Sequence, residues 1–163
     1  MPTPDAPDPA HEHRDPFPGF PVDSDVTREA DVPPPSIHTA VVLAVAAGGC
    51  LGAEARWALA EALPHDAGQL PWSTLLANVV GCFLIGVLMV LVTERWPHRR
   101  LARPFLGTGI LGGFTTFSTY VVDTRALAAA HRPGLAAVYL VGTLVAGLVA
   151  VVAGLRLTER VVR

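Results

Sequence analysis

A polar stretch in the middle of the chain is the first feature of the sequence that could carry chemistry. Residues 107–120 read GTGILGGFTTFSTY and contain four glycines and five serines or threonines. This composition makes a poor continuous helix, because glycine and short hydroxyl side chains have low helix propensity. Where backbone is irregular at membrane depth, its freed carbonyls can bind a cation. The stretch therefore predicts a broken helix that forms either a binding site or a tight packing surface.

Thr74, Asn78 and Cys82 recur every four residues in an earlier hydrophobic segment. That spacing places the three side chains on one face of a helix. An amide inside hydrocarbon is costly unless it is paired. We therefore expect Asn78 either to bond across helices as a structural contact or to present its NH₂ group to a solute.

Small and polar residues also line one face of the last hydrophobic segment, where Tyr139, Thr143 and Gly147 are spaced four apart. This face favours a tight helix interface or a track of hydroxyl donors for ions. In the first segment, Gly52 belongs to a small-residue pattern typical of close helix packing. Arg56 follows it, and either reaches the lipid headgroups or lines a charged vestibule that gathers anions.

The sequence argues against an enzyme. All twelve basic residues are arginine, which excludes a phosphate-binding lysine loop and a Schiff-base lysine. Residues 107–112 match the dinucleotide pattern G-x-G-x-x-G, but no strand precedes them and Arg132 stands where an acidic ribose ligand is expected. The histidines are scattered, so no helix carries a pair of metal ligands. Cys50 and Cys82 are typical of buried packing thiols.

Four hydrophobic stretches must position these side chains. Each is near the roughly 20 residues that a helix needs to cross the hydrocarbon core. They cover residues 37–59, 73–92, 106–129 and 135–155. Tryptophans 57, 72 and 96 fall at their ends, as an interfacial aromatic belt predicts. The predicted fold class is an all-α integral membrane protein with four transmembrane helices per subunit, the third of which is broken.

Residues 1–36 differ sharply in composition from the rest of the chain. They hold ten of the fifteen prolines and eight of the fourteen acidic residues. Such a segment cannot bury enough apolar surface to fold, so it is predicted to be a disordered tail. Residues 37–163 are predicted to form the transmembrane domain, which carries ten arginines, six acidic residues and a net charge of +4.

Arginines near the ends of the predicted helices are unevenly distributed. One side of the membrane holds three, namely Arg56, Arg125 and Arg132. The side that holds both termini has eight: Arg28, Arg95, Arg99, Arg100, Arg103, Arg156, Arg160 and Arg163. By the positive-inside rule, both termini are predicted to be cytoplasmic. Four helices are few for a self-sufficient transporter, so an oligomer is expected.

Three motifs together resemble the Fluc (CrcB) family of fluoride channels: GGCLGAEARW at 48–57, TLLANVVG at 74–81 and GGFTTFSTY at 112–120. The resemblance extends over roughly residues 37–157. It implies a channel for passive fluoride efflux across the bacterial plasma membrane, which lowers cytoplasmic fluoride. It also implies an antiparallel dual-topology dimer with two pores. A structural Na⁺ at the dimer centre would be held by the backbone carbonyls of Gly112 and Thr115 from each subunit.

The same resemblance implies roles for individual side chains. Phe117 and Tyr120 would turn their ring edges toward fluoride, since an aromatic edge carries the positive end of the ring quadrupole. Asn78 would be a pore-lining donor, and Arg56 would stand at the vestibule. The implied hydroxyl donors are Ser118, Thr119, Tyr139 and Thr143. Two positions depart from the family pattern: Tyr120 replaces the usual phenylalanine, and Gly147 replaces a hydroxyl residue.

The arginine imbalance adds a hypothesis about assembly. A chain that inserts in both orientations should have nearly balanced charge at its two sides, and this chain does not. We therefore hypothesise a fixed orientation, with a paralogous partner of reversed charge bias completing an antiparallel heterodimer in place of a homodimer. The alternative function is a small membrane transporter or a non-conducting subunit of a heteromeric complex.

Overall fold

The computed structural model describes residues 35–66 and 68–162. The sequence predicts a disordered tail over residues 1–36. Of these, residues 1–34 lie outside this described part. Within it the chain is all-helical, with six segments: α1 (Pro35–Ala62), α2 (Trp72–Glu94), η2 (Arg103–Leu111), α3 (Gly112–Phe114), α4 (Phe117–Ala129) and α5 (Pro133–Val162). In η2 the backbone is wound as a π-helix.

Four of the helical stretches are long and apolar enough to cross a membrane, which confirms the predicted fold class. They cover Thr39–Ala62, Trp72–Glu94, Arg103–Ala129 and Pro133–Val162. The third of them is the broken one, formed by η2, α3 and α4 in succession. The last helix continues to Val162, seven residues beyond its predicted end. Its final turns carry Arg156 and Arg160, which suits a helix that extends from the apolar core into the headgroup region.

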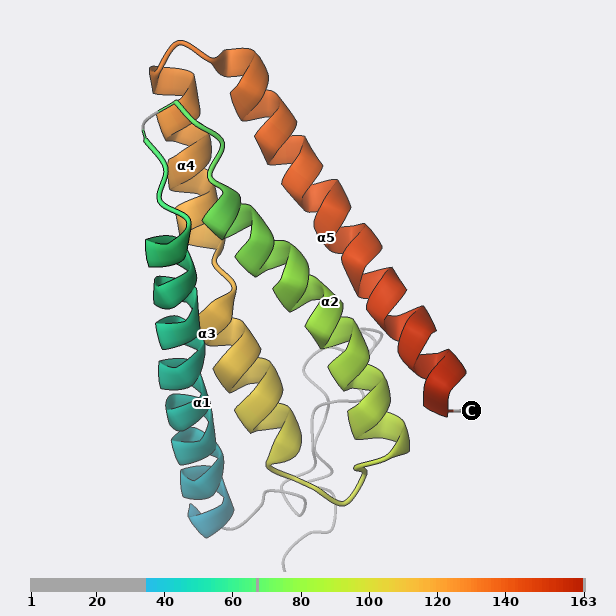
Figure 1. Cartoon of the computed structure of the whole chain (residues 1–163). Helices are drawn as coiled ribbons and strands as arrows, with labels where there is room; N and C mark the ends of the chain where they lie inside the picture. Colours follow the sequence, from blue (N-terminus) through green and yellow to red (C-terminus); the bar gives the residue numbers. More distant parts are fainter. Residues whose placement is uncertain (1–34, 67, 163) are drawn as a thin grey trace, which may run out of the picture. The chain divides into compact units, whose positions relative to one another are not determined.

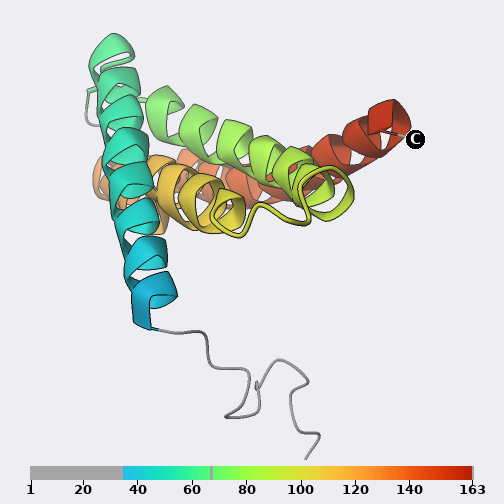
Figure 2. The same cartoon turned by 90° about the horizontal axis from the view of Figure 1, so that it is seen from below.

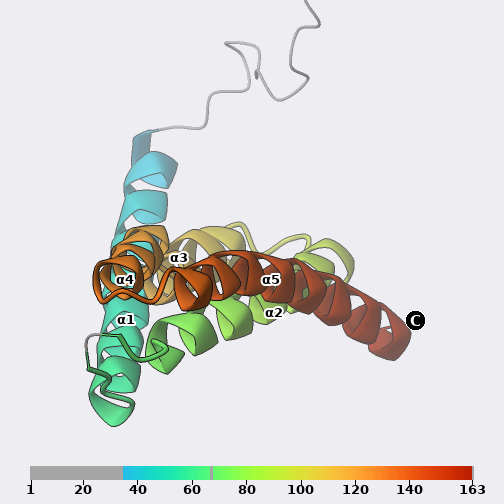
Figure 3. The same ribbon diagram turned by 90° about the horizontal axis from the view of Figure 1, so that it is seen from above.

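The helices pack in two main pairs. α2 runs beside α5, whereas α1 runs along η2 and α3 (Figure 1). In the views from below and from above, α1 lies at one edge of the bundle and α5 reaches the other (Figures 2 and 3). α4 packs against the beginning of α5. The break in the third span thus lies where the two pairs meet.

Glycines let α1 approach the third span backbone to backbone. A Cβ at Gly48 would overlap the carbonyl of Phe105, and one at Gly52 would overlap the carbonyl of Ile110. On the facing side, a Cβ at Gly113 would lie 3.1 Å from the amide nitrogen of Ala53. The small-residue pattern of the first hydrophobic segment is therefore a packing surface, as its spacing predicts.

Glycines also let α2 and α5 approach each other backbone to backbone. A Cβ at Gly86 of α2 would overlap the Val151 carbonyl of α5, and one at Gly154 of α5 would overlap the Phe83 carbonyl of α2. The outer faces of the helices expose many large apolar side chains. In a membrane protein such faces contact lipid tails, so close packing of small residues has to hold the helices together.

Candidate functional site

The third span breaks at two threonines. α3 ends at Phe114, Thr115 and Thr116 are extended, and α4 begins at Phe117. Their backbone angles are φ −81°, ψ 157° for Thr115 and φ −149°, ψ 123° for Thr116. The predicted interruption of this helix is confirmed, and it falls directly after the glycine-rich part of the motif.

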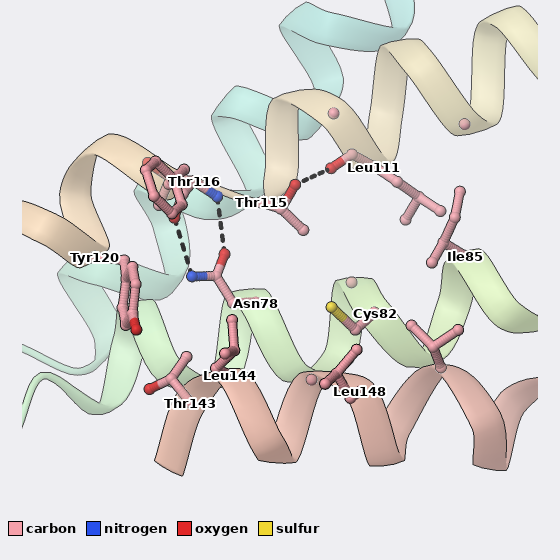
Figure 4. Close-up of a pocket in the computed structure, with 16 residues that line it drawn as sticks. Asn78, Cys82, Ile85, Leu111, Thr115, Thr116, Tyr120, Thr143, Leu144 and Leu148 are labelled. Carbon is pink, nitrogen blue, oxygen red and sulfur yellow. Dashed lines mark hydrogen bonds between the residues drawn. The ribbon is translucent and has the colours of Figure 1, made fainter. Parts of the chain in front are cut away.

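Asn78 of α2 holds the break with both ends of its amide group. The Thr116 N–H donates to Asn78 Oδ1 at 2.8 Å, and Asn78 Nδ2 donates to the Thr116 carbonyl at 3.0 Å (Figure 4). The Thr116 hydroxyl in turn caps α4, because its oxygen accepts the Thr119 N–H at 3.1 Å. The unwound backbone therefore has side-chain partners in place of helical ones, as membrane depth requires.

These substitute bonds free two carbonyls. In a continuous helix the Thr116 N–H would donate to the Gly112 carbonyl, and the Thr119 N–H would donate to the Thr115 carbonyl. Here the two N–H groups are taken by Asn78 and by the Thr116 hydroxyl. Gly112 and Thr115 are the residues to which the resemblance assigns a sodium ion. Freed carbonyl oxygens fit such an ion, because hard cations prefer oxygen ligands.

A groove of about 490 Å³ opens beside the break. Six of the predicted site residues line it: Asn78, Gly112, Thr115, Phe117, Tyr120 and Thr143. Figure 4 shows Asn78, Tyr120 and Thr143 facing the same space, with Leu144 and Leu148 of α5 beside them. Most of the remaining lining is apolar, including Ile85, Leu111 and Val151. The groove therefore places a few polar groups in a hydrophobic wall, as is usual for a binding site.

The two aromatic residues of the motif differ in their surroundings. Their ring centroids lie 5.9 Å apart with a 50° tilt between the planes. Phe117 is 77% exposed, whereas Tyr120 is 6% exposed and packs against the Tyr139 ring at 5.5 Å. The Tyr120 hydroxyl donates to the Leu140 carbonyl on α5. One ring is thus free at the surface of the chain, and the other is anchored.

Two buried hydroxyls in this region have no hydrogen-bond partner in the described part of the chain. They belong to Tyr139 and Thr143, which are 1% and 6% exposed. The Tyr139 hydroxyl comes close to Thr74 and Asp123 without the geometry of a hydrogen bond to either. Buried polar groups are nearly always paired, so an unpaired hydroxyl calls for an explanation such as a bound ion or water.

Four predicted residues lie off the groove wall. Ser118 is exposed, and its hydroxyl is 3.3 Å from that of Thr116. The Thr119 hydroxyl accepts from the Thr116 hydroxyl at 2.9 Å. Tyr139 packs behind Tyr120. Arg56 is half-buried on α1, a helix that contributes no described residue to the groove lining.

Sequence reasoning missed a polar contact next to these residues. The Thr74 hydroxyl donates to Asp123 Oδ2 at 2.7 Å, and His65 Nε2 lies 4.0 Å from Asp123 Oδ1. The Asp123 side chain is only 12% exposed. A carboxylate within a hydrophobic segment was the available signal, because such a group needs a partner. Among the described residues, no group of three or more His, Cys, Asp or Glu side chains could hold a metal ion.

Comparison with known proteins gives a consistent result. A family model described as CrcB-like protein, Camphor Resistance (CrcB), matches residues 43–155. The chain is 55% identical over 104 residues to the fluoride-specific ion channel FluC 2 of Streptomyces avermitilis, covering 64% of this chain and 66% of that relative. It is 50% identical over 125 residues to FluC 2 of Nocardia farcinica, covering 77% and 88%. The match to FluC 1 of Streptomyces coelicolor is 54% over 111 residues, covering 68% and 72%.

Proposed function

This chain belongs to the CrcB family, and from that premise we propose that it is a fluoride-specific ion channel of the bacterial plasma membrane. The channel lets fluoride leave the cytoplasm passively and so lowers cytoplasmic fluoride. The observation that carries the proposal is the groove beside the broken helix. There the Asn78 amide, two aromatic rings and the unpaired Thr143 hydroxyl meet in a mostly apolar wall.

The polar groups of the groove suit a small anion that must shed its water. Asn78 uses one amide hydrogen on the Thr116 carbonyl and has a second to offer. Thr143 adds a hydroxyl with no other partner in the described chain. The edges of Phe117 and Tyr120 attract an anion weakly. Such donors replace hydration without trapping the ion, which conduction requires.

The remaining residues extend this path. Ser118, Thr119 and Tyr139 add hydroxyls around the break, and Arg56 gathers anions at the vestibule. The Tyr139 hydroxyl is buried next to Thr74 and Asp123 and lacks a hydrogen-bond partner among the described residues. It lies behind Tyr120 and off the groove wall, so its role as a donor to the ion stays a prediction.

We propose that the working unit is an antiparallel dimer with a structural Na⁺ at its centre. The freed carbonyls of Gly112 and Thr115 supply two oxygen ligands from this chain, fewer than a hard cation takes. A second subunit would supply the others. Support comes from the exposure of Gly112 and Phe117, which lie at the surface of the single chain beside the break.

We further propose that the chain has a fixed orientation with both termini cytoplasmic, and that its partner is a paralogous subunit. The imbalance of eight arginines against three supports this arrangement. Two relatives from Streptomyces avermitilis, named FluC 2 and FluC 3, are both similar to this chain. Reporter fusions at both termini test the orientation, because equal signal from the two sides of the membrane would exclude it.

A second candidate is a small proton-coupled transporter, and Asp123 is the observation that favours it. Such a transporter needs a carboxylate within the membrane, and Asp123 is largely buried. However, its Oδ2 already accepts the Thr74 hydroxyl. This bond between α2 and α4 gives the buried carboxylate a structural role that needs no proton transfer.

Fluoride efflux from liposomes tests the proposed function. Purified protein is reconstituted alone and together with a co-expressed paralogue, and fluoride release is followed with an electrode under a potassium gradient with valinomycin. We expect rapid release that requires no ATP and no proton gradient. Absence of release in both preparations, in vesicles shown to contain assembled dimer, would contradict the channel. Release that depends on a proton gradient would favour the transporter.

A further inference from the structure

A hydrogen bond between two helices fixes one of the rings of the groove. The Tyr120 hydroxyl on α4 donates to the Leu140 carbonyl on α5, twenty residues further along the chain. The ring itself is 6% exposed and contacts the rings of both Phe117 and Tyr139. Tyr120 is thus held both at its hydroxyl, by a hydrogen bond, and at its ring, by aromatic contacts.

This bond occupies the only hydrogen that the phenol can donate. A tyrosine hydroxyl has one O–H, and here it points to the Leu140 carbonyl. An anion in the groove therefore meets the ring edge of Tyr120 and not its hydroxyl. The acceptor also lies on the turn of α5 that carries the unpaired hydroxyls, between Tyr139 and Thr143. The bond consequently ties that turn of α5 to α4.

We propose that Tyr120 is a positioning residue that acts as a brake on conduction. Its hydroxyl pins the ring to α5, so the ring cannot turn aside as an ion passes between the Asn78 side and the Thr143 side of the groove. Phe117 has no such anchor and is 77% exposed. The wall of the path thus consists of one ring without a hydrogen-bond anchor and one ring with such an anchor. This inference rests on the proposed channel function.

The test compares fluoride efflux from the wild type with that from Tyr120→Phe, in the assembled channel with its partner subunit. Removing the anchor should raise the rate about three-fold, the factor equivalent to the ~0.6 kcal/mol average of interhelical hydrogen bonds in membranes. The ratio of fluoride to chloride flux should not change, because the hydroxyl does not contact the ion. Thr124→Val is the matched control. The Thr124 hydroxyl donates to the Tyr120 carbonyl within α4, so this variant loses a hydroxyl but keeps the anchor.

A second readout does not depend on flux. The chain has two tyrosines, so Tyr120 is the sole tyrosine of the Tyr139→Phe protein. The tyrosine doublet in its Raman spectrum, recorded with the paralogous partner built without tyrosine, should report a strong hydrogen-bond donor. A phenol that is free or acts as an acceptor would overturn the inference.

The flux results separate the two proposals. An unchanged or slower rate in Tyr120→Phe, or an altered fluoride-to-chloride ratio, would overturn the brake while leaving the channel in place. No flux from either protein, with donation intact in the Raman spectrum, would overturn the channel function and the brake with it.

Discussion

The two halves of the third span are held by different means. Before the break, η2 and α3 lie against α1 through glycines, with backbone touching backbone at Gly48 and Gly52. After the break, α4 is held by hydrogen bonds, from Asn78 to Thr116 and from Tyr120 to α5. Glycine packing fixes a position but leaves no side chain free to act. The proposed anion-facing side chains therefore lie in the polar half, whereas the glycine-packed half contributes the Gly112 carbonyl proposed for the cation.

The largest effect is expected on the glycine-packed half, from Gly52→Ala. The added Cβ would overlap the Ile110 carbonyl and approach the Phe114 amide, and backbone cannot move aside as a flexible side chain can. We expect a loss of stability of about 2 kcal/mol or more, and no assembled protein at moderate temperature. Size-exclusion chromatography after heating in detergent measures this.

Gly49→Ala is its control, three residues earlier on the same helix. A Cβ at Gly49 would meet no described atom within 4 Å. Because alanine is the better helix former by about 1 kcal/mol, this variant should be at least as stable as the wild type. If both variants assembled equally well, the glycine contacts would not explain how the first half is held.

On the other half, Phe117→Ile should abolish fluoride efflux without disrupting assembly. The Phe117 ring is mostly exposed in the single chain, so its removal costs little within the fold. Isoleucine has no ring edge with which to attract an anion. Val121→Ala, one turn further along α4 at a position that is 45% exposed, should keep its flux. Undiminished flux in Phe117→Ile would remove the aromatic pair from the mechanism.

Asn78→Ala should reduce efflux by about 100-fold, because it removes an amide donor to the anion and a hydrogen bond to a charged group is worth up to about 3 kcal/mol. The change leaves the Thr116 N–H without its acceptor, and an unpaired buried group costs about 1–3 kcal/mol. That N–H avoids the penalty only by returning to the Gly112 carbonyl, which takes the carbonyl away from a cation. Sodium dependence of thermal stability measures the second effect, which should weaken in the variant. Thr93→Val removes a bond within α2 far from the break and should leave flux and sodium response unchanged.

The comparison also shows what the sequence could predict. Glycines four residues apart predicted the packing surface of α1. The run of glycine, serine and threonine predicted the break in the third span. Both features depend on local composition, which a sequence shows directly. The sequence left two roles open for Asn78. The structure gives it the bonding role across helices, and its use as a pore donor stays a prediction.

Long-range partners were not predictable in the same way. The freed Gly112 carbonyl depends on Asn78, 38 residues from Thr116, and the anchor of Tyr120 is a backbone carbonyl on another helix. A backbone carbonyl has no sequence signature, so no pattern could indicate Leu140. The Thr74–Asp123 bond joins residues 49 positions apart. Its one sequence signal was a carboxylate within a hydrophobic segment.

The smallest effect, and the sharpest test of the polar half, is expected from Thr143→Val. The Thr143 hydroxyl is buried without a partner in the described chain, so replacing it with a methyl of the same shape should leave stability unchanged or raise it by about 1 kcal/mol. A hydrogen bond to a charged group is worth about 1.5 kcal/mol or more, so efflux should fall about ten-fold. Thr158→Val removes a hydroxyl that is paired with the Gly154 carbonyl, and it should show the reverse pattern of lower stability with normal flux. Equal flux in the two variants would mean that the unpaired Thr143 hydroxyl does not bind the passing ion. Conduction would then depend on polar groups other than those of the groove.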